Sequence, residues 1–387
     1  MRMAAVAGIG ETKMGRYPER SLREMIFEAG SRAILDAGIE RSEIEAVYFG
    51  NFNAQQLCGQ GHMGAMVSEV LGLGNVPTVR TEAACASGGL AFCMALTAVM
   101  SGMHDIVLVG GAEKMTHRPT DAVTEAIVSA MDYEKEAMEG YTFPANFAMI
   151  ANRYFYEHRN VKREMGMCAV NAHRNASLNP DAQMPKEVTL EKVLAAAPVA
   201  APLSLFDCSL VTDGAAFLVL TTRGIAERLG RHRVIEVAGS GHAGDSLTLA
   251  SKSSITSFAA TKAAAQQAYG QAKLTAAEID FAEVHDCFTI TQIINMEDLG
   301  FAEAGKGGDL VAEGGIALEG SMPINPSGGL KAKGHPIGAT GISQIFEVVT
   351  QLRGNAGARQ LKQADIGLTH NLGGTAATCV VHIFRGA

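Results

Sequence analysis

A cysteine at a strand-to-helix turn is the residue in this sequence best suited to nucleophilic chemistry. Cys85 lies in the segment 82–89, where an expected strand ends near Thr81 and a helix begins at once. The N-terminus of a helix carries a partial positive charge, which favours the thiolate and lowers the thiol pKa. Free backbone N–H groups at such a turn can also bind an oxyanion. The segment predicts a covalent nucleophile, with a buried apolar cysteine as the plain alternative.

Three histidines accompany this cysteine at other turns. His285, His335 and His370 each lie where an expected strand ends or a helix begins. A histidine adjacent to a cysteine is what a thiolate nucleophile requires, because the imidazole can accept the thiol proton. A lone histidine at a strand end is more often a structural hydrogen-bonder. Together with Cys85 the three also have the residue types of a zinc site, but no two form a local ligand pair, and we expect no metal.

An internal repeat indicates how these turns come together. Three segments of the first half recur in the same order in the second half, which indicates a duplicated unit. His335 then takes, in the second copy, the strand-to-helix turn that Cys85 has in the first. The pseudo-symmetry predicts that the two side chains meet between the halves. The matching segments are 6–10 with 237–241, 37–45 with 272–280, and 105–110 with 365–370.

Each half alternates expected strands and helices, which favours a mostly parallel sheet covered on both faces. The halves are predicted as domains 1–232 and 233–387, packed through their most apolar helices near 88–100 and 338–351. The first half contains an extra segment, about residues 116–202, without a counterpart in the second. Prolines interrupt its helical patterns, and we interpret it as an inserted lid over the site.

Composition and charge argue against several functions. The 387 residues are 47% hydrophobic and 19% charged, which is typical of a globular protein. A net charge of −8 and the lack of tryptophan argue against nucleic-acid binding. The uncharged stretch 83–103 has the length of a membrane span, but its glycines and serines favour a buried core helix, so we expect no span. Seven scattered cysteines without a CxxC pair predict a reduced, cytoplasmic protein.

The four loops that carry Cys85, His285, His335 and His370, in this order along the chain, resemble those of the thiolase superfamily. The resemblance extends over nearly the whole chain. The shared features are Cys-x-Ser at Cys85, Gly-His-Pro at His335 and the duplicated α/β halves. Two departures from most thiolases narrow the resemblance. The residues His-Asp-Cys-Phe at 285–288 stand where most thiolases carry Asn-Glu-Ala-Phe, and His370 stands where they carry a second catalytic cysteine. Both departures are similar to the sterol-carrier-protein type of thiolase and its acetyl-CoA acetyltransferase-like relatives.

The resemblance implies a fold and an activity. The fold is that of thiolases, two pseudo-symmetric mixed-sheet α/β halves in five layers (αβαβα) with an inserted lid. The implied activity is that of an acyltransferase of lipid metabolism, which forms or cleaves a 3-ketoacyl-CoA by Claisen chemistry. Coenzyme A and acyl-CoA enter as substrates, with no permanently bound cofactor. We also expect a homodimer or larger closed assembly, since an apolar first-half strand can pair across a two-fold axis.

The resemblance also implies roles for the side chains. Cys85 attacks the thioester carbonyl and holds the acyl group, and His335 takes the thiol proton. His370 replaces the second cysteine as the acid/base for the α-proton of the second substrate. His285 joins His335 in one oxyanion site. Claisen chemistry needs these parts, because it requires an acyl carrier, a base for a weakly acidic C–H and two places for negative charge.

Other groups are implied to bind the substrate. The second oxyanion site would consist of backbone N–H groups at Cys85 and in the turn Leu372-Gly373-Gly374. Ser209 matches a family position near the pantetheine arm. The CoA phosphates need cations, for which Arg153 and Arg163 are candidates, although a solvated helix face is the plainer interpretation of these arginines.

Two other hypotheses remain. A decarboxylating condensing enzyme of the ketosynthase kind also uses one cysteine and two histidines on a duplicated fold. The Gly-His-Pro loop and the lack of a His-Gly-Thr-Gly-Thr segment favour a thiolase. The second hypothesis is a thiolase-like subunit or scaffold that works with a small partner protein in an acyl-transferring or aldol-cleaving complex. The intact set of Cys85, His335 and His370 argues against a purely structural role.

Overall fold

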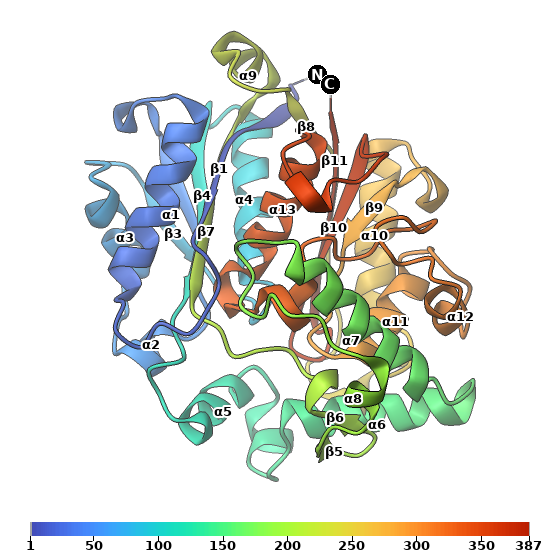
Figure 1. Ribbon diagram of the computed structural model, residues 1–387. Coiled ribbons are helices and arrows are strands. Elements are labelled where there is room, and N and C mark those ends of the chain that lie inside the picture. Colours follow the sequence, from blue (N-terminus) through green and yellow to red (C-terminus); the bar gives the residue numbers. More distant parts are fainter. Residues whose placement is uncertain (1, 387) are drawn as a thin grey trace.

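The computed structural model describes residues 2–386, in which nine strands form one continuous hydrogen-bonded sheet (Figure 1). The strands of the two halves are joined through two residue pairs, Ala5 with Glu236 and Val6 with Ile235. The nine strands can therefore be described as two sheets, one in each half, which are joined at one point between β1 and β8. In spatial order the strands are β3 (Thr78–Thr81), β2 (Ala46–Gly50), β4 (Ile106–Glu113), β7 (Gly214–Thr222), β1 (Ala4–Glu11), β8 (Ile235–Gly244), β11 (Thr378–Gly386), β10 (Ile366–Gly373) and β9 (Phe281–Glu283).

The expectation of mostly parallel sheets is wrong. Within residues 2–386, the parallel strand pairs of the nine strands are β2 with β3, β2 with β4, and β9 with β10. Strands β1, β7, β8 and β11 are antiparallel to their neighbours. The reason lies in two connections: a short turn joins β10 to β11, and β7 returns beside β4 from the inserted segment. The mixed-sheet α/β halves that the resemblance implied are confirmed.

Helices form three layers around the two sheets. Helices α4 (Ser87–Ser101) and α13 (Thr340–Leu352) pack against each other and against strands of both halves, so they form the central layer. Helices α1 (Leu22–Ala37) and α3 (Met63–Leu71) cover the first sheet, and α10 (Ala259–Ala272) covers the second. Figure 1 shows these layers from left to right as helix, sheet, helix, sheet, helix. The other α-helices outside the inserted segment are α2 (Ala54–Cys58), α9 (Arg223–Leu229), α11 (Thr289–Asp298) and α12 (Gly307–Ala312).

The repeated glycines bring the outer helix of each half close to its sheet. A Cβ on Gly8 or Gly10 would lie 2.3 or 2.4 Å from a carbonyl oxygen of α1. A Cβ on Gly239 or Gly241 would lie 2.2 or 1.9 Å from a carbonyl oxygen of α10. Side chains at these positions would push the helices away. The repeated Val-Ala-Gly-x-Gly segment therefore serves the same packing in both halves.

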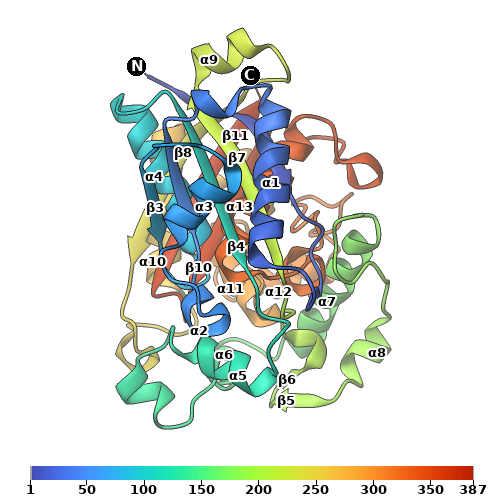
Figure 2. The same cartoon turned by 90° about the vertical axis from the view of Figure 1, so that its left-hand side faces the viewer.

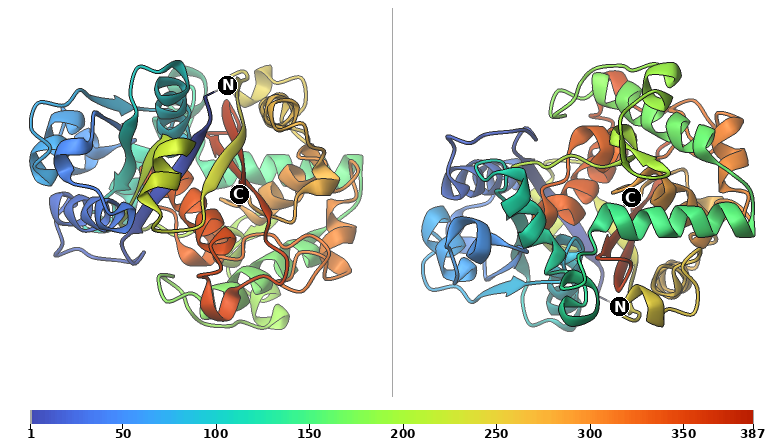
Figure 3. Two further views of the ribbon diagram at one scale, coloured as in Figure 1. Left: turned by 90° about the horizontal axis from the view of Figure 1, so that it is seen from above. Right: turned by 90° about the horizontal axis from the view of Figure 1, so that it is seen from below.

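The inserted segment crosses the lower end of both halves (Figures 1 and 2). Helices α6 and α7 pack against α11 of the second half, so the segment bridges the halves. Seen from below, it lies in front of the central helices (Figure 3, right). Its elements are α5 (Thr120–Val128), α6 (Phe143–Glu157), α7 (Lys162–Ser177), α8 (Leu190–Leu194), β5 (Pro198–Ala200) and β6 (Leu203–Ser204).

One stretch of the described chain, Ala84–Ser101, is long and apolar enough to cross a membrane. This stretch is α4 with the turn before it, and α4 packs between the two sheets. A central-layer helix needs an apolar surface on most sides. The position of α4 in the fold therefore accounts for its composition.

Candidate active site

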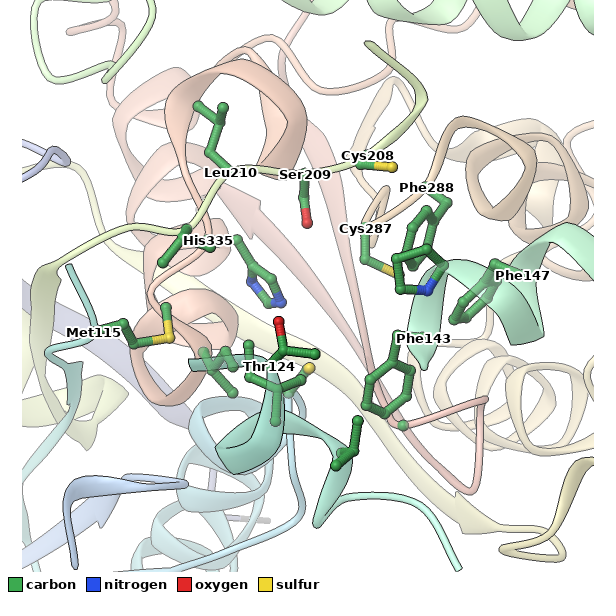
Figure 4. Close-up of a pocket in the computed structure, with 17 residues that line it drawn as sticks. Met115, Thr124, Phe143, Phe147, Cys208, Ser209, Leu210, Cys287, Phe288 and His335 are labelled. Atoms are coloured by element: carbon green, nitrogen blue, oxygen red, sulfur yellow. The ribbon is translucent and has the colours of Figure 1, made fainter. Parts of the chain in front are cut away.

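A cavity of about 180 Å³ lies where the chain enters the two central helices (Figure 4). Cys85, before α4, and His335, before α13, both line it. The inserted segment and residues 208–211 form the opposite wall. Most of the lining is apolar, as is usual for sites that bury the apolar part of a small ligand. The apolar residues are Met115, Ile127, Val128, Phe143, Pro144, Phe147, Leu210, Val211, Phe288 and Ile337.

The structure brings together three of the four predicted catalytic side chains. The Sγ of Cys85 and one ring nitrogen each of His285 and His335 lie within 4.8 Å of one another. The pairing of Cys85 with His335 is the one that the internal repeat predicted. These distances would also suit a metal ion held by three ligands.

The turn that carries Cys85 is held by its own side chains. Ala84 has a φ of 49°, a left-handed conformation that costs a non-glycine residue about 1–3 kcal/mol. The hydroxyl of Ser87 donates to the carbonyl of Ala84 at 2.6 Å and accepts from the N–H of Ala83 at 3.0 Å. The Glu82 carboxylate accepts from the N–H of Ala84 at 2.6 Å. This small network holds the strained turn and directs the thiol into the cavity.

The expectation of a low thiol pKa at Cys85 is wrong. Burial raises the pKa of Cys85 to about 12, and a hydrogen bond from the N–H of Gly374 lowers it only in part. The desolvation cost of a thiolate exceeds the stabilisation that a helix N-terminus gives. Cys85 is therefore a thiol at rest and needs a base to become a nucleophile.

His335 has the environment of that base. Its backbone N–H donates to the hydroxyl of Thr212 at 2.9 Å, which fixes the loop. Its Nδ1 lies 2.6 Å from the hydroxyl of Thr340, so the ring has a defined orientation. Burial lowers the pKa of His335 to about 3, and the ring is therefore neutral and able to accept a proton.

His285 enters the cluster from the end of β9. Its Nδ1 lies 3.1 Å from Nδ2 of Asn371, and its carbonyl accepts from Asn295 at 2.8 Å. Its Nε2 is buried and has no hydrogen-bond partner within residues 2–386. Burial and the two neighbouring histidines His335 and His370 lower the pKa of His285 well below its usual range. A buried N–H without a protein partner is suited to bind a substrate oxygen.

The placement of His370 in the cavity is wrong. Neighbouring residues of a strand point to opposite faces of the sheet, and His370 points to the outer layer. Its Nε2 lies 3.1 Å from the hydroxyl of Thr261 on α10, and its Nδ1 accepts from the N–H of His285 at 3.4 Å. Both ring nitrogens are thus occupied, and the ring does not line the cavity. His370 supports the loop of His285 and is not positioned to reach a substrate.

Cys287 takes the place in the cavity that was expected of His370. It lines the cavity together with Cys85, and Figure 4 shows it between Ser209 and Phe288. Burial and the nearby Cys85 raise the pKa of Cys287 well above its usual range. The sequence signal was its spacing from His285, because residues two apart in extended chain point to the same side.

The turn after β10 carries one of the predicted backbone donors. The N–H of Gly374 hydrogen-bonds to the Cys85 thiol, and Gly374 also lines the cavity. A Cβ on Gly373 would lie 2.2 Å from the carbonyl oxygen of Ala83, so a side chain here would displace the nucleophile turn. Leu372 is buried in the core on the α10 side. Gly374 is thus the donor of this turn, and its two neighbours position it.

The three predicted substrate-binding residues differ in position. Ser209 lines the cavity, and its N–H donates to the carbonyl of Cys287 at 2.9 Å. Arg153 is exposed on α6 and pairs with Glu157 at 2.6 Å. Arg163 is exposed on α7. Neither arginine lines the cavity, so their contact with CoA phosphates stays a prediction.

A buried carboxylate that the sequence analysis missed connects the two halves behind the cavity. Glu113, at the end of β4, accepts from the N–H groups of Phe52, Asn53 and Gly338 at 2.9, 3.1 and 3.1 Å. Burial raises the pKa of Glu113 to about 7, while these hydrogen bonds lower it. Because Gly338 lies in the loop that begins with His335, Glu113 holds that loop against the first half. No local motif marks such a contact between distant segments.

The geometry agrees with the comparison to known families. The description "Thiolase, N-terminal domain" matches residues 3–224, and "Thiolase C-terminal domain-like" matches residues 241–386. The chain belongs to the thiolase family. It is an acyltransferase of the thiolase type, and the cluster of Cys85, His285 and His335 lies where the two matched regions meet.

Individual relatives narrow the position of this thiolase within the family. "Acetyl-CoA acetyltransferase" of Methanothermobacter thermautotrophicus is 47% identical over 386 residues, which are 99% of this chain and 100% of that protein. "Sterol carrier protein 2" of Oryctolagus cuniculus is 31% identical over 382 residues, which are 95% of this chain and 69% of that protein. The solved structure "Ltp2-ChsH2(DUF35) aldolase" has a TM-score of 0.86 and 26% identity, covering 100% of this chain and 98% of that chain. The resemblance to sterol-carrier-type and acetyl-CoA acetyltransferase-like proteins is confirmed.

Proposed function

We propose that this thiolase joins or cleaves short acyl-CoA units through an acyl-Cys85 intermediate. The observation that carries the proposal is the meeting of Cys85, neutral His335 and Cys287 around one apolar cavity. The relative named acetyl-CoA acetyltransferase, 47% identical over its full length, supports acetyl-CoA as the acyl donor. CoA enters and leaves as a substrate.

The first half of the reaction transfers the acyl group to the protein. His335 takes the proton of Cys85, and the thiolate attacks the thioester carbonyl. The N–H of Gly374, which already bonds the Cys85 thiol, is placed to stabilise the oxyanion. The C–S bond to CoA breaks, and the CoA sulfur takes the proton of Cys287. Acyl-Cys85, a protonated His335 and a Cys287 thiolate remain.

The second half forms the carbon–carbon bond. The Cys287 thiolate is a strong base because the pKa of its thiol is raised, and it takes the α-proton of a second acyl-CoA. Nε2 of His285 donates to the enolate oxygen. The carbanion attacks the acyl carbonyl, and the Cys85 thiolate leaves and recovers its proton from His335. Protons and charges balance, and each group returns to its resting state.

Two further proposals concern partners. Strand β3 is an edge of the sheet and exposes Val79, which supports pairing with a second copy of the chain. The structural likeness to the aldolase whose name includes a DUF35 component supports a small partner protein, with aldol cleavage as the second candidate function.

Seven free cysteines support a reducing, cytoplasmic location.

A panel of CoA thioesters, with mass detection of the modified peptide, tests the proposed function. Acetyl-CoA should add one acyl group to Cys85, and added CoA should remove it. The same panel with proteins that co-purify tests the need for a partner. Acylation at another residue, or turnover by Cys85→Ala, would contradict the proposal.

A further inference from the structure

Asn371 lies between the nucleophile turn and His285. It follows His370 on β10, but its side chain points to the opposite face, into the central layer, and is 2% exposed. Its Oδ1 accepts from the N–H of Gly89 at 3.2 Å. Its Nδ2 lies 2.9 Å from the carbonyl oxygen of Cys85 and 3.1 Å from Nδ1 of His285. One amide thus connects α4, the nucleophile and an imidazole of the site.

Two backbone groups fix which end of this amide is the oxygen. The N–H of Gly89 can only donate, and the carbonyl of Cys85 can only accept. With the amide turned over, the NH₂ group would face the N–H of Gly89, and Oδ1 would face the carbonyl of Cys85. Both contacts would be repulsive in a buried site, where an unmade hydrogen bond costs about 1–3 kcal/mol. The NH₂ group therefore points to Cys85 and to His285.

This orientation decides where the proton of His285 lies. Nδ1 of His285 faces a group that can only donate, so Nδ1 is an acceptor and carries no hydrogen. A neutral imidazole has one N–H, which must then be at Nε2. That atom is the one without a protein partner within residues 2–386, in a ring that has a nitrogen within 4.8 Å of the Cys85 thiol and of a His335 nitrogen. A protonated Nε2 has no free lone pair, which also makes the three residues a poor zinc site.

His335 has the opposite arrangement. The hydroxyl of Thr340 donates to the carbonyl of Pro336 at 3.1 Å, so its oxygen is free to accept from Nδ1 of His335 at 2.6 Å. The proton of His335 is then on Nδ1, and Nε2 has the lone pair. The two rings therefore present one donor and one acceptor to the same small space.

We propose that Asn371 is a positioning residue that fixes the proton of His285 on Nε2, so that His285 is a hydrogen-bond donor to a thioester oxygen. The same amide holds the carbonyl of Cys85, which ties the position of the donor to that of the nucleophile. The proposal deepens the proposed function and rests on it for the identity of the oxygen that is bound. The position of the proton belongs to the resting enzyme and can be measured without substrate.

The test is nuclear magnetic resonance of the full-length protein labelled with ¹⁵N-histidine. Long-range ¹H–¹⁵N correlations distinguish protonated from unprotonated ring nitrogens. Among the 11 histidines, the signals of His285 are those missing in His285→Gln. The wild-type protein should have the proton on Nε2. In Asn371→Asp the carboxylate can only accept, so the proton should move to Nδ1.

Asn295→Asp is the matched control, because Asn295 donates to the carbonyl of His285 and, within residues 2–386, makes no hydrogen bond to its ring. It should leave the proton on Nε2. A wild-type protein with the proton on Nδ1, or an Asn371→Asp spectrum like that of wild type, would overturn the proposal. The wild-type spectrum alone tests where the proton of His285 lies, so the proposal can be tested even if a variant does not fold. Failure of acyl-Cys85 formation would instead count against the proposed function.

Kinetics give a second readout. In Asn371→Ala the donor is no longer fixed, and kcat of condensation should fall about 100–1000-fold, as for loss of one oxyanion donor. Acylation of Cys85 should fall less, because its oxyanion is bound by backbone N–H groups. An equal loss in both steps would mean that Asn371 only supports the fold of the turn.

Discussion

The rings of His285 and His335 lie edge to face, with centroids 5.2 Å apart and 88° between their planes. Burial lowers the pKa of His335 to about 3, and burial with the neighbouring imidazoles lowers that of His285 well below its usual range. If both rings were charged at this separation, they would repel each other strongly, because the buried site lacks water to screen the charges. Both rings are therefore neutral in the resting protein near neutral pH.

Acylation of Cys85 should therefore not decline as the pH falls through the normal range of histidine. The free base of His335 is present above about pH 3, because its pKa is lowered and not raised. Single-turnover acylation, followed by intact mass from about pH 8 to pH 5, should give a flat profile. A loss centred near pH 6.5 would show that His335 titrates as an ordinary, solvated histidine.

The rate of Cys85 alkylation, in contrast, should depend strongly on pH. Its pKa is raised to about 12, so in the resting enzyme the thiolate fraction grows about tenfold with each pH unit. The rate of iodoacetamide modification, measured by peptide mass between about pH 6 and 10, should rise without a plateau. A plateau near neutral pH would reveal a stable thiolate and contradict the effect of burial.

The sequence was sufficient to predict the parts of the site that backbone turns create. Cys85 and His335 occupy equivalent turns of a repeat, so pseudo-symmetry alone predicts that they meet. The glycine pairs 8 with 10 and 239 with 241 mark the repeat because helices pack directly on them. Local motifs and a duplicated pattern contain this information.

Other parts depended on packing that one sequence does not reveal. The register of β10 decides that Asn371, and not His370, faces the site, and a shift of one residue reverses the two. The pKa of Cys85 depends on how much of the chain covers the thiol, not on the helix that follows it. Glu113 contacts a loop in the other half of the chain, and no local pattern marks that contact.

His370 should contribute mainly to stability. His370→Ala removes the imidazole and leaves the hydroxyl of Thr261 and the N–H of His285 without their hydrogen bonds. The free energy of unfolding should fall by about 2–5 kcal/mol, measured by chemical denaturation. A variant with unchanged stability that forms acyl-Cys85 but cannot condense would restore His370 as the acid/base.

Glu113 should hold the loop of His335 through the hydrogen bonds that its carboxyl oxygens accept. Glu113→Gln places an NH₂ group against backbone N–H donors, and we expect a loss of about 2–4 kcal/mol in the free energy of unfolding. The Tm and denaturation midpoint measure this loss. Glu125→Gln, which removes the same charge from an exposed site on α5, is the control and should change stability little. Equal effects would mean that net charge, not the loop contact, is responsible.

The division of work between the two cysteines of the cavity is the central claim of the mechanism. It is tested most directly by intact-protein mass spectrometry of Cys287→Ala mixed with acetyl-CoA, with product analysis on the same samples. This variant should still acylate Cys85, more slowly because the proton donor for the CoA sulfur is missing, while condensation should fall further, by about two to four powers of ten, because the base for the α-proton is also missing. Cys93→Ala, which removes a thiol of α4 outside the cavity, is the control and should do both. Condensation by Cys287→Ala at the wild-type rate would contradict the account.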